Sequence, residues 1–365
     1  MNENKRIFFY NAIPMPHSIL LHKKLVEAGY EVDFWYYKGL TKLYPWSQID
    51  NGIQYNIYDN SWAGFKKIFH QSRQSQLLIV TGWHTWIHIF LILYSFIFRK
   101  NMALWLDVNE QKISKFKYFR NYLLLKITRH LFITGKYGIN ITSKQYGIST
   151  SKMKDFPYIT AVFEATELKK INTYRRKQLE TRGQIRLMIS NRFIERKGYN
   201  VVIDALKILN PIVLQHFDIT ILGIGPDFDI YKKQFKSIGC NIILTGWVEY
   251  DDYIENLKNT DVYLHASLFE PYGIPPMDAM CCGKLVVGSS GVISCMDKIE
   301  NGINGFIYDK DKSSELAKIL THIQENPNII YDLGDAALES QPFLGYQYNL
   351  TLINSILKMD VTHKP

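Results

Sequence analysis

Two carboxylates and a glycine turn lie close together in residues 267–283, which read SLFEPYGIPPMDAMCCG. Glu270 and Asp278 are separated by seven residues, and Gly273 lies between them. The six residues before this segment are apolar and β-prone, and the proline pair 275–276 suits the first turn of a helix, so we expect a strand that leads into a helix start. Such a start presents free N–H groups and the positive end of the helix dipole. The segment therefore predicts a phosphate site beside two acids.

The two acids indicate a second kind of ligand at this site. A carboxylate repels phosphate, so Glu270 and Asp278 would be unfavourable in a site for phosphate alone. Hydroxyl groups are suitable donors to carboxylates, and sugars carry several of them. The segment therefore predicts a site for a nucleotide-sugar, in which Gly273 lets the ligand approach the backbone closely.

These residues resemble the donor site of the retaining glycosyltransferases of family four, in which two glutamates separated by seven residues flank a Pro-Phe/Tyr-Gly core. The resemblance extends through four further segments, in the family's order and spacing, over about residues 184–310. They are 190–198 (SNRFIERKG), 222–226 (LGIGP), 283–291 (GKLVVGSSG) and 301–306 (NGINGF). The resemblance implies an α/β protein of the GT-B fold. In that fold two Rossmann-like domains face each other across a cleft, with the donor on the second domain and the acceptor on the first.

The resemblance also assigns roles to single residues. Arg192 and Lys197 match the pair that binds the diphosphate of the donor. The N–H groups of Gly273 and Ile274 would assist them, because negative charge builds on the departing phosphate. Glu270 matches the acid that binds hydroxyls of the transferred sugar.

Asp278 and two loops would complete the donor site. Asp278 stands where the family has a longer glutamate that holds the ribose, and the missing methylene would shift or weaken this contact. By the same resemblance Gly225 and Pro226 border the donor, and Gly246 and Trp247 lie near the base. Each of these four residues also fits an ordinary structural turn.

The sequence predicts no metal and no cofactor besides the nucleotide-sugar co-substrate. No Asp-x-Asp pair directly follows a predicted strand, and no cluster of His, Asp and Cys has the spacing of metal ligands. The four cysteines lack C-x-x-C spacing and fit buried reduced thiols. We therefore expect a metal-independent enzyme, in which cationic side chains and N–H groups stabilise the leaving diphosphate.

The first half of the chain offers two polar candidates at predicted strand ends. His84 follows the strand 77–80 and Asp107 follows the strand 103–106. Either residue could orient or deprotonate the acceptor hydroxyl, and either could instead be a capping or turn residue. The loop 11–17 lacks the glycine pair that many family members carry after the first strand.

Positive charge is concentrated in this first half. Residues 1–170 carry 23 Lys or Arg and 11 Asp or Glu, whereas the rest of the chain carries 20 and 23. Residues 111–154 include ten basic residues and no acidic one, interleaved with aromatic and aliphatic side chains. This pattern fits an anionic membrane surface, and it also fits a solvated basic face; no motif indicates nucleic acid. The residues expected at a membrane surface are Lys112, Lys115, Lys117, Arg120, Lys126 and Arg129.

The apolar run 86–98 is short for a bilayer span, which takes about 20 residues. We expect it to be a buried helix of the first domain. The sequence shows no N-terminal pattern of a secretory leader. It therefore predicts a cytoplasmic protein that touches the inner face of the membrane without crossing it.

Predicted strands and helices alternate along the whole chain, which indicates two parallel α/β units in tandem. We expect an acceptor-binding Rossmann-like domain over residues 1–165 and a polar, basic linker over 166–183. A nucleotide-sugar-binding Rossmann-like domain should follow over 184–335, and C-terminal helices over 336–365 should cross back to the first domain.

Together these features predict a retaining hexosyltransferase. It would move a sugar from a nucleoside diphosphate to a hydroxyl of a growing bacterial surface glycan of the lipopolysaccharide, O-antigen or capsule type, carried on a lipid. Two alternatives stay open: a soluble enzyme with a small-molecule or protein acceptor, and an inactive GT-B module that binds a glycan or a partner. The presence of Arg192, Lys197 and Glu270 argues against the inactive module, because such a module needs neither a diphosphate-binding pair nor a sugar-binding acid.

Overall fold

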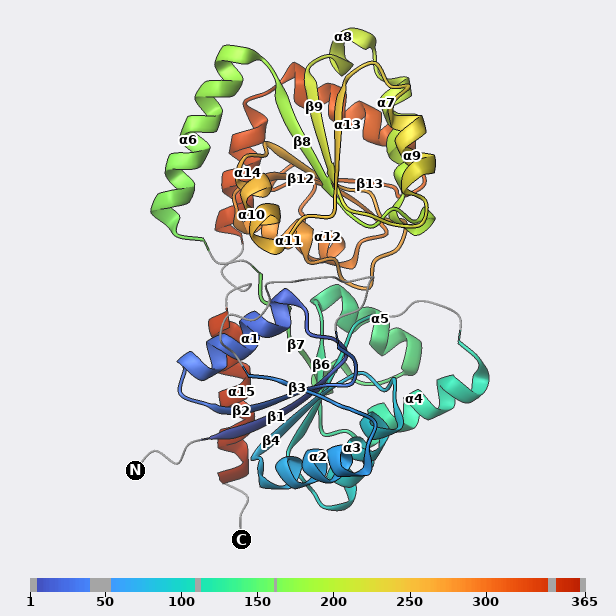
Figure 1. Ribbon diagram of the computed structural model, residues 1–365, viewed down its shortest axis with the longest axis vertical. Helices are drawn as coiled ribbons and strands as arrows, with labels where there is room; N and C mark the ends of the chain where they lie inside the picture. The colour runs from blue at the N-terminus through green and yellow to red at the C-terminus, as the bar shows by residue number, and fades with distance from the viewer. Residues whose placement is uncertain (1–4, 40–53, 109–112, 161–162, 341–345, 362–365) are drawn as a thin grey trace. The chain divides into compact units, whose positions relative to one another are not determined.

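The computed structural model describes residues 5–39, 54–108, 113–160, 163–340 and 346–361 of the chain. The chain forms two compact units: Met1–Ile159 together with Gly345–Pro365 (unit 1), and Thr160–Leu344 (unit 2). Each unit is an open parallel β-sheet with helices packed against both faces (Figure 1).

Unit 1 holds a seven-stranded sheet of order β3-β2-β1-β4-β5-β6-β7, in which every neighbouring pair is parallel. Its strands are β1 (Arg6–Asn11), β2 (Glu31–Tyr36), β3 (Asn56–Ile57), β4 (Leu77–Thr81), β5 (Met102–Leu106), β6 (His130–Ile133) and β7 (Met153–Asp155). Its helices are α1 (Pro16–Glu27), α2 (Trp62–Gln74), α3 (Trp86–Ile97), α4 (Lys115–Ile127), α5 (Lys136–Tyr146) and α15 (Tyr346–Val361), with a 3-10 turn at Thr150–Lys152.

Alternate residues of β1 pack on opposite faces of this sheet. Ile7 and Phe9 belong to the apolar cluster that includes α1 and α15, whereas Phe8 and Tyr10 belong to the cluster that includes α2, α3 and α4. All four side chains are fully buried. A strand that is covered on both faces must be apolar at every position, which is why the central strands read as continuous apolar runs.

Unit 2 holds a six-stranded parallel sheet of order β10-β9-β8-β11-β12-β13. Its strands are β8 (Ile185–Ser190), β9 (Phe217–Leu222), β10 (Asn241–Gly246), β11 (Val262–His265), β12 (Leu285–Ser289) and β13 (Phe306–Tyr308). Its helices are α6 (Ala165–Arg182), α7 (Tyr199–Ile208), α8 (Pro211–Leu214), α9 (Phe228–Phe235), α10 (Tyr250–Lys258), α11 (Pro275–Cys281), α12 (Ile293–Lys298), α13 (Ser313–Glu325) and α14 (Ile329–Glu339), with a 3-10 turn at Glu195–Lys197.

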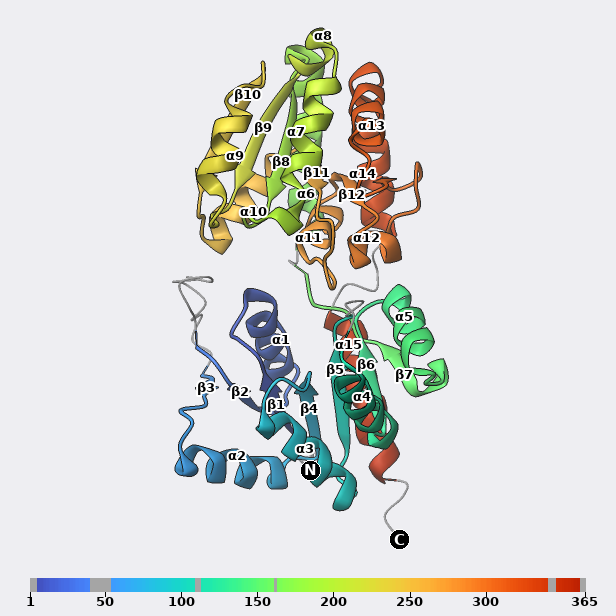
Figure 2. The same ribbon diagram turned by 90° about the vertical axis from the view of Figure 1, so that its right-hand side faces the viewer.

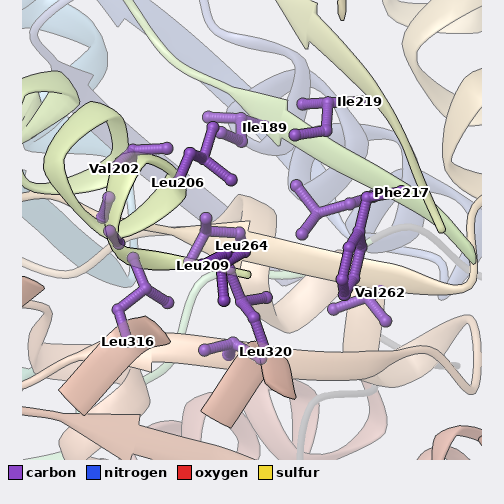
Figure 3. Close-up of a cluster of buried hydrophobic side chains, with 14 of the residues drawn as sticks. Ile189, Val202, Leu206, Leu209, Phe217, Ile219, Val262, Leu264, Leu316 and Leu320 are labelled. Carbon is purple, nitrogen blue, oxygen red and sulfur yellow. The ribbon is translucent and has the colours of Figure 1, made fainter. Parts of the chain in front are cut away.

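The main core of unit 2 lies between its sheet and the helices α7 and α13. Ile189 of β8 and Leu264 of β11 join Leu206 of α7 and Leu320 of α13 in one cluster (Figure 3). Each of these side chains is at most 1% exposed. Burying a side chain of this size stabilises a fold by about 1.5–3 kcal/mol, so this layer fixes the central strands in place.

The linker predicted over 166–183 is wrong, because this segment is the helix α6 of unit 2. Its polar residues face solvent, but Arg175 is 1% exposed and forms a bidentate pair with Asp261, which is also 1% exposed. The two N···O distances are 3.2 and 2.6 Å. Tyr331 of α14 donates a further hydrogen bond to Asp261 at 3.2 Å. One buried ion pair thus attaches a largely polar helix to the start of β11.

The C-terminal helices divide between the two units. Helix α14 stays in unit 2, whereas α15 packs against α1 in unit 1. Ile353 and Leu357 of α15 are buried in the unit 1 core. Asn349 donates to the backbone carbonyl of Pro157 at 2.9 Å, and Asn354 accepts from Tyr30 at 2.7 Å. The predicted return of the chain to the first domain is therefore made by α15 alone.

The run 86–98 forms α3 as predicted, but only one side of this helix is buried. Ile87 and Leu91 lie in the core, whereas Trp86 is 54% and Ile97 67% exposed. The prediction of a buried helix is wrong for its outer side. Among the residues that the structure describes, no helix is both long enough and apolar enough to cross a bilayer.

We expect Arg175→Met to lower the free energy of unfolding of unit 2 by about 3 kcal/mol. Asp261 would stay buried with its charge uncompensated, although the N–H of Arg186 and the hydroxyl of Tyr331 would still donate to it. Urea unfolding followed by circular dichroism measures the loss.

The adjacent Arg176→Met is the matched control. Arg176 approaches Glu180 and Asp332 at 3.8 and 3.9 Å on the exposed side of α6, so its removal should cost less than about 1 kcal/mol. Equal losses for the two variants would contradict the role assigned to Arg175.

Candidate functional site

The centre of the unit 2 sheet is the point at which the order of strands reverses. From β8 the chain adds β9 and β10 on one side, and it then returns to place β11, β12 and β13 on the other. β8 and β11 are therefore neighbours. Open α/β sheets bind ligands at the carboxyl ends of strands beside such a switch point. The loops that leave β8 and β11 here carry Arg192, Lys197 and Glu270.

Lys197 and Glu270 form an ion pair between these two loops, in which the Lys197 Nζ donates to Oε2 of Glu270. Lys197 is 8% exposed, and the Glu270 side chain is 17% exposed. Gly198, which follows Lys197, has a φ of +72°, and a Cβ there would lie 1.9 Å from the carbonyl oxygen of Ala266. Only glycine allows this approach, so Gly198 brings Lys197 up to the end of β11.

Burial and charge act in opposite directions on the pKa values of this pair. Burial lowers the pKa of Lys197, and the attraction of Glu270 offsets only part of this shift. Burial by itself would raise the pKa of Glu270, but opposing interactions, led by the charge of Lys197, hold the pKa below its usual value. Glu270 is therefore ionised at neutral pH and accepts hydrogen bonds only.

A chain of polar side chains, half-buried at Asn191 and buried at His265 and Ser267, supports Glu270. Asn191 Nδ2 lies 3.4 Å from Nδ1 of His265, and Nε2 of His265 lies 3.3 Å from Oγ of Ser267. The Ser267 hydroxyl donates to Oε2 of Glu270 at 3.4 Å. Because the amide of Asn191 can only donate from Nδ2, His265 accepts at Nδ1 and donates from Nε2. Burial lowers the pKa of His265 to about 3, which keeps this ring neutral.

Sequence reasoning missed His265 and Ser267. The signal that could have found them is the alternation of strand residues, since both lie on the same side of the chain as it leaves β11. Ser267 also precedes Glu270 by three residues, which is the spacing at which a turn brings two side chains together. Neither residue faces solvent, because His265 is 1% and Ser267 0% exposed.

The expected strand, glycine turn and helix start are present in this order. Gly273 has a φ of +95°, and its carbonyl accepts from Oγ of Ser294 at 2.6 Å. Within the described part of the chain, the N–H groups of Gly273 and Ile274 donate to no protein acceptor. A Cβ on Gly273 would lie 3.3 Å from Cγ of Glu270, which places the backbone of Gly273 beside the acid. Helix α11 begins at the next residue, Pro275.

Positive charge surrounds Glu270. Arg192 is half-buried in the loop after β8, and Arg196 is exposed on the 3-10 turn that ends at Lys197. Both guanidinium groups lower the pKa of Lys197, so all three cations act on one small region. The backbone carbonyl of Arg196 also accepts from the N–H of Leu268, which ties the two loops together at 2.9 Å. These three cations favour binding of an anion next to Glu270. Arg196 was not among the cations predicted from the sequence.

Asp278 lies on the inner side of α11, where it is only 3% exposed. Its Oδ2 accepts from the hydroxyl of Tyr253 on α10 at 3.2 Å. Burial raises the pKa of Tyr253 well above its usual value, and the charge of Asp278 adds to this shift. Asp278 therefore has a protein partner of its own, in addition to any contact with a ligand.

The other predicted donor residues lie at the same edge of the sheet, where the loops after β8, β9 and β10 are joined. A Cβ on Gly225 would lie 2.2 Å from the carbonyl oxygen of Phe193, and Pro226 follows in that loop. The carbonyl of Gly246 accepts from the N–H of Gly223 at 2.7 Å. Trp247 Nε1 donates to the side chain of Glu249 at 3.3 Å. These glycines have structural reasons to be there, whether or not a ligand contacts them.

The two candidates in unit 1 follow neighbouring strands but have different surroundings. His84, after β4, is exposed, with its ring 6.4 Å from that of Tyr37. Asp107, after β5, accepts from Oγ1 of Thr134 and from the hydroxyl of Tyr158, each at 2.9 Å. Sequence reasoning missed both of these donors to Asp107, which come from the loops after β6 and β7.

The basic residues predicted for a membrane surface lie mostly on α4. Lys115, Lys117, Lys126 and Arg129 are exposed. Arg120 is half-buried, and its guanidinium donates to Oδ1 of Asn121 at 2.8 Å. The remaining candidate, Lys112, lies outside the described residues.

Metal ligands and reactive thiols were both expected to be absent. In the described ranges no group of three or more His, Cys, Asp or Glu side chains could hold a metal ion; metal independence itself stays a prediction. The cysteines are free thiols, and burial raises the pKa of Cys282 to about 11. Cys282 and Cys295 are fully buried.

Comparisons with known proteins find similarity to glycosyltransferases. Residues 170–339 match the sequence model of the family described as glycosyl transferases group 1. An uncharacterized glycosyltransferase of Methanocaldococcus jannaschii is 25% identical over 187 residues, which cover 50% of this chain and 47% of that protein. The alpha-monoglucosyldiacylglycerol synthase of Acholeplasma laidlawii is 29% identical over 127 residues, 34% of this chain and 31% of that protein. The chain therefore spans less than half the length of these relatives.

A solved structure covers nearly the whole chain. Anabaena Alr3699/HepE in complex with UDP and glucose superposes with a TM-score of 0.73 at 18% identity, over 97% of this chain and 100% of that one. At this identity the likeness concerns the fold alone. It confirms the predicted fold class, two Rossmann-like α/β domains of the GT-B type.

We expect Lys197→Met to change how stability depends on pH. In the native chain the lowered pKa of Glu270 contributes stability above its unfolded pKa of about 4.3, and this contribution is lost as the pH falls through the folded pKa. Without Lys197, burial would raise the pKa of Glu270, so the variant should lose stability as the pH rises from about 4 to 7. Its deficit in unfolding free energy should therefore grow by about 1 kcal/mol or more over this range, as measured by urea unfolding.

The exposed neighbour provides the control. Arg196→Met should give a deficit that changes less with pH, because the exposed Arg196 lowers the pKa of Glu270 less than Lys197 does. A deficit for Lys197→Met that is equal at both pH values would show that Lys197 does not set the ionisation of Glu270.

Proposed function

We propose that this chain, whose residues 170–339 match the group 1 glycosyltransferases, is a retaining glycosyltransferase that transfers a hexosyl group from a nucleoside diphosphate to a hydroxyl. The observation that carries the proposal is the pairing of Lys197 with Glu270 at the switch point of the unit 2 sheet. A cation cluster that also holds a buried acid fits a ligand with a diphosphate and a sugar better than it fits phosphate alone.

The cations and free N–H groups would stabilise the leaving group. Breaking the bond between the anomeric carbon and the diphosphate oxygen builds negative charge on that oxygen. Arg192 and Lys197 would bind the diphosphate, and the N–H groups of Gly273 and Ile274 point to no protein acceptor that would compete for them. All four groups come from the two loops beside the switch point, so they are positioned before the donor binds.

Glu270 would bind hydroxyl groups of the transferred sugar. Its carboxylate is ionised and accepts from Lys197 and Ser267, both through Oε2. Oε1 is therefore the oxygen that can accept from a sugar hydroxyl. Asp278 would hold the ribose from the inner side of α11, while Gly225, Pro226, Gly246 and Trp247 would border the nucleotide.

Retention would follow if the acceptor attacks from the face that the diphosphate leaves. The acceptor oxygen bonds to the anomeric carbon, the bond to the diphosphate breaks, and the acceptor proton passes to the departing phosphate oxygen. This proton route needs no dedicated base. His84 or Asp107 of unit 1 would then orient the acceptor hydroxyl, and Asp107 is already oriented by Thr134 and Tyr158.

For the acceptor we propose a lipid-carried bacterial surface glycan of the lipopolysaccharide, O-antigen or capsule type. One relative is named as an alpha-monoglucosyldiacylglycerol synthase, so a partly similar chain is associated with a lipid product. A soluble small-molecule or protein acceptor is the alternative. An inactive binding module is a less economical explanation, because such a module needs neither the free N–H groups nor the ion pair.

The experiment is a thermal-shift titration with UDP, GDP, dTDP and ADP, followed by the matching nucleotide-sugars. We expect at least one nucleoside diphosphate to raise the melting temperature; a ligand at a hundredfold excess over Kd stabilises by about 2.7 kcal/mol. Arg192→Ala should weaken that binding by about tenfold or more, because it removes a charge-assisted hydrogen bond to the diphosphate.

Two further variants separate the roles. Glu270→Gln should lower turnover of the nucleotide-sugar by about a hundredfold and should change the affinity for the free nucleoside diphosphate much less, because the carboxylate would contact the sugar directly and the diphosphate only through Lys197. Lys207→Ala on the exposed end of α7 is the control and should change neither quantity. The assignment of the donor site is wrong if no nucleotide stabilises the chain. It is also wrong if Arg192→Ala and Lys207→Ala have the same affinity for the nucleoside diphosphate.

A further inference from the structure

Large apolar side chains are exposed on one helical layer of unit 1. Helices α2, α3 and α4 cover the same face of the sheet, since their inward residues belong to one apolar cluster. Several of their outward residues are apolar and more than half exposed. We call the region defined by six of them the α2–α4 surface: Trp62, Trp86, Ile97, Phe98, Phe116 and Phe119.

On α4 the exposed apolar residues form a stripe. Phe116, Phe119 and Leu123 are spaced by three and four residues, which places them on one side of the helix. Phe116 is 78% and Phe119 58% exposed, whereas Leu124 and Leu125 on the inner side are buried. A helix with apolar residues on its outer side as well as its inner one has more apolar surface than its own domain can cover.

Helix α3 continues this surface. Trp86, Leu93 and Ile97 repeat at seven and four residues along its outer side. Helix α3 contacts α4, and the ring of Trp86 lies 5.0 Å from that of Phe65 on α2. Both views of the molecule show α2 and α3 side by side (Figure 1, Figure 2). The exposed residues of the three helices therefore belong to neighbouring elements.

The charge of this region is strongly positive. From residue 59 to residue 155 the sequence carries fifteen Lys or Arg and four acidic residues, Asp59, Asp107, Glu110 and Asp155. Asp107 is occupied by hydrogen bonds from Thr134 and Tyr158. Exposed Lys115 and Lys117 flank the stripe on α4, and Lys126 lies 5.8 Å from the ring centroid of Tyr122. Cations thus accompany the apolar side chains with little local counter-charge.

We propose that the α2–α4 surface binds an anionic lipid bilayer. The aromatic and aliphatic side chains would enter the boundary between headgroups and acyl chains, while the lysines contact lipid phosphates. Nucleic acid is disfavoured as the occupant, because the six residues that define this surface are large and apolar, whereas nucleic-acid interfaces are more polar than protein–protein interfaces. A second copy of this chain would bring like charges together, which disfavours a symmetric dimer on this surface.

The proposal goes beyond the glycosyl transfer proposed above, because it depends on no residue of the donor site. It also gives the exposed aromatic residues a role in binding the bilayer. A basic face that contacts only solvent would not need them. A chain held at a bilayer in this way would meet lipid-carried acceptors at the membrane rather than in solution.

The test is flotation of the full chain with phosphatidylcholine vesicles that contain or lack phosphatidylglycerol. We expect association only with the anionic vesicles. The double variant Phe116→Ser/Phe119→Ser should weaken it by about tenfold or more, because less apolar area enters the bilayer. Lys115→Gln/Lys117→Gln should weaken it by roughly twenty-five-fold at low salt, since each basic residue near the surface contributes about fivefold.

The matched control lies in unit 2, where Ile208 and Ile212 are 56% and 70% exposed. Ile208→Ser/Ile212→Ser should leave vesicle binding unchanged. Circular dichroism of all variants verifies that they are folded. Nucleotide-induced stabilisation, measured separately, shows whether a variant has also changed the donor site. Binding that is absent, or that survives both α4 variants, would overturn the proposal. So would a dimer in solution that Phe116→Ser/Phe119→Ser dissociates, because a second copy would then cover the surface.

Discussion

The ion pair between Lys197 and Glu270 joins the two loops on which the proposed chemistry depends. Its formation requires Gly198, whose missing side chain lets the 3-10 turn approach Ala266 at the end of β11. Burial costs the charged form of Lys197 more free energy than its attraction to Glu270 recovers, so the pair is better explained by positioning than by stability. With the pair in place, Glu270 is ionised, and the cations beside it are held at a fixed position before any ligand binds.

β11 is held at both ends by buried polar groups. At its amino end, Asp261 pairs with Arg175 of α6. At its carboxyl end, His265 and Ser267 connect the strand to Glu270. A carboxylate held by interlocked groups can be positioned to the fraction of an ångström that the proposed chemistry needs. The helix that first reads as a linker thus belongs to the framework of the site.

Much of unit 2 was predictable because its signals are local. A glycine turn, a proline pair and spaced acids place Glu270 and Gly273 beside a helix start, and the structure has that start at α11. The role of α6 was not predictable, because a single buried arginine among exposed polar residues gives no periodic signal. The same holds for His265, which a strand pattern cannot distinguish from a core residue. The outer side of α3 was mispredicted because an apolar run does not say which of its residues a neighbour covers.

The most direct test of the account is to incubate the purified chain with UDP-, GDP-, dTDP- and ADP-sugars and to follow the released sugar by NMR before its anomers equilibrate. We expect at least one donor to be hydrolysed and the sugar to appear first with the anomeric configuration of the donor. Release of the opposite anomer would contradict retention. No release from any donor that binds would contradict the assignment of Lys197 and Glu270 to glycosyl transfer.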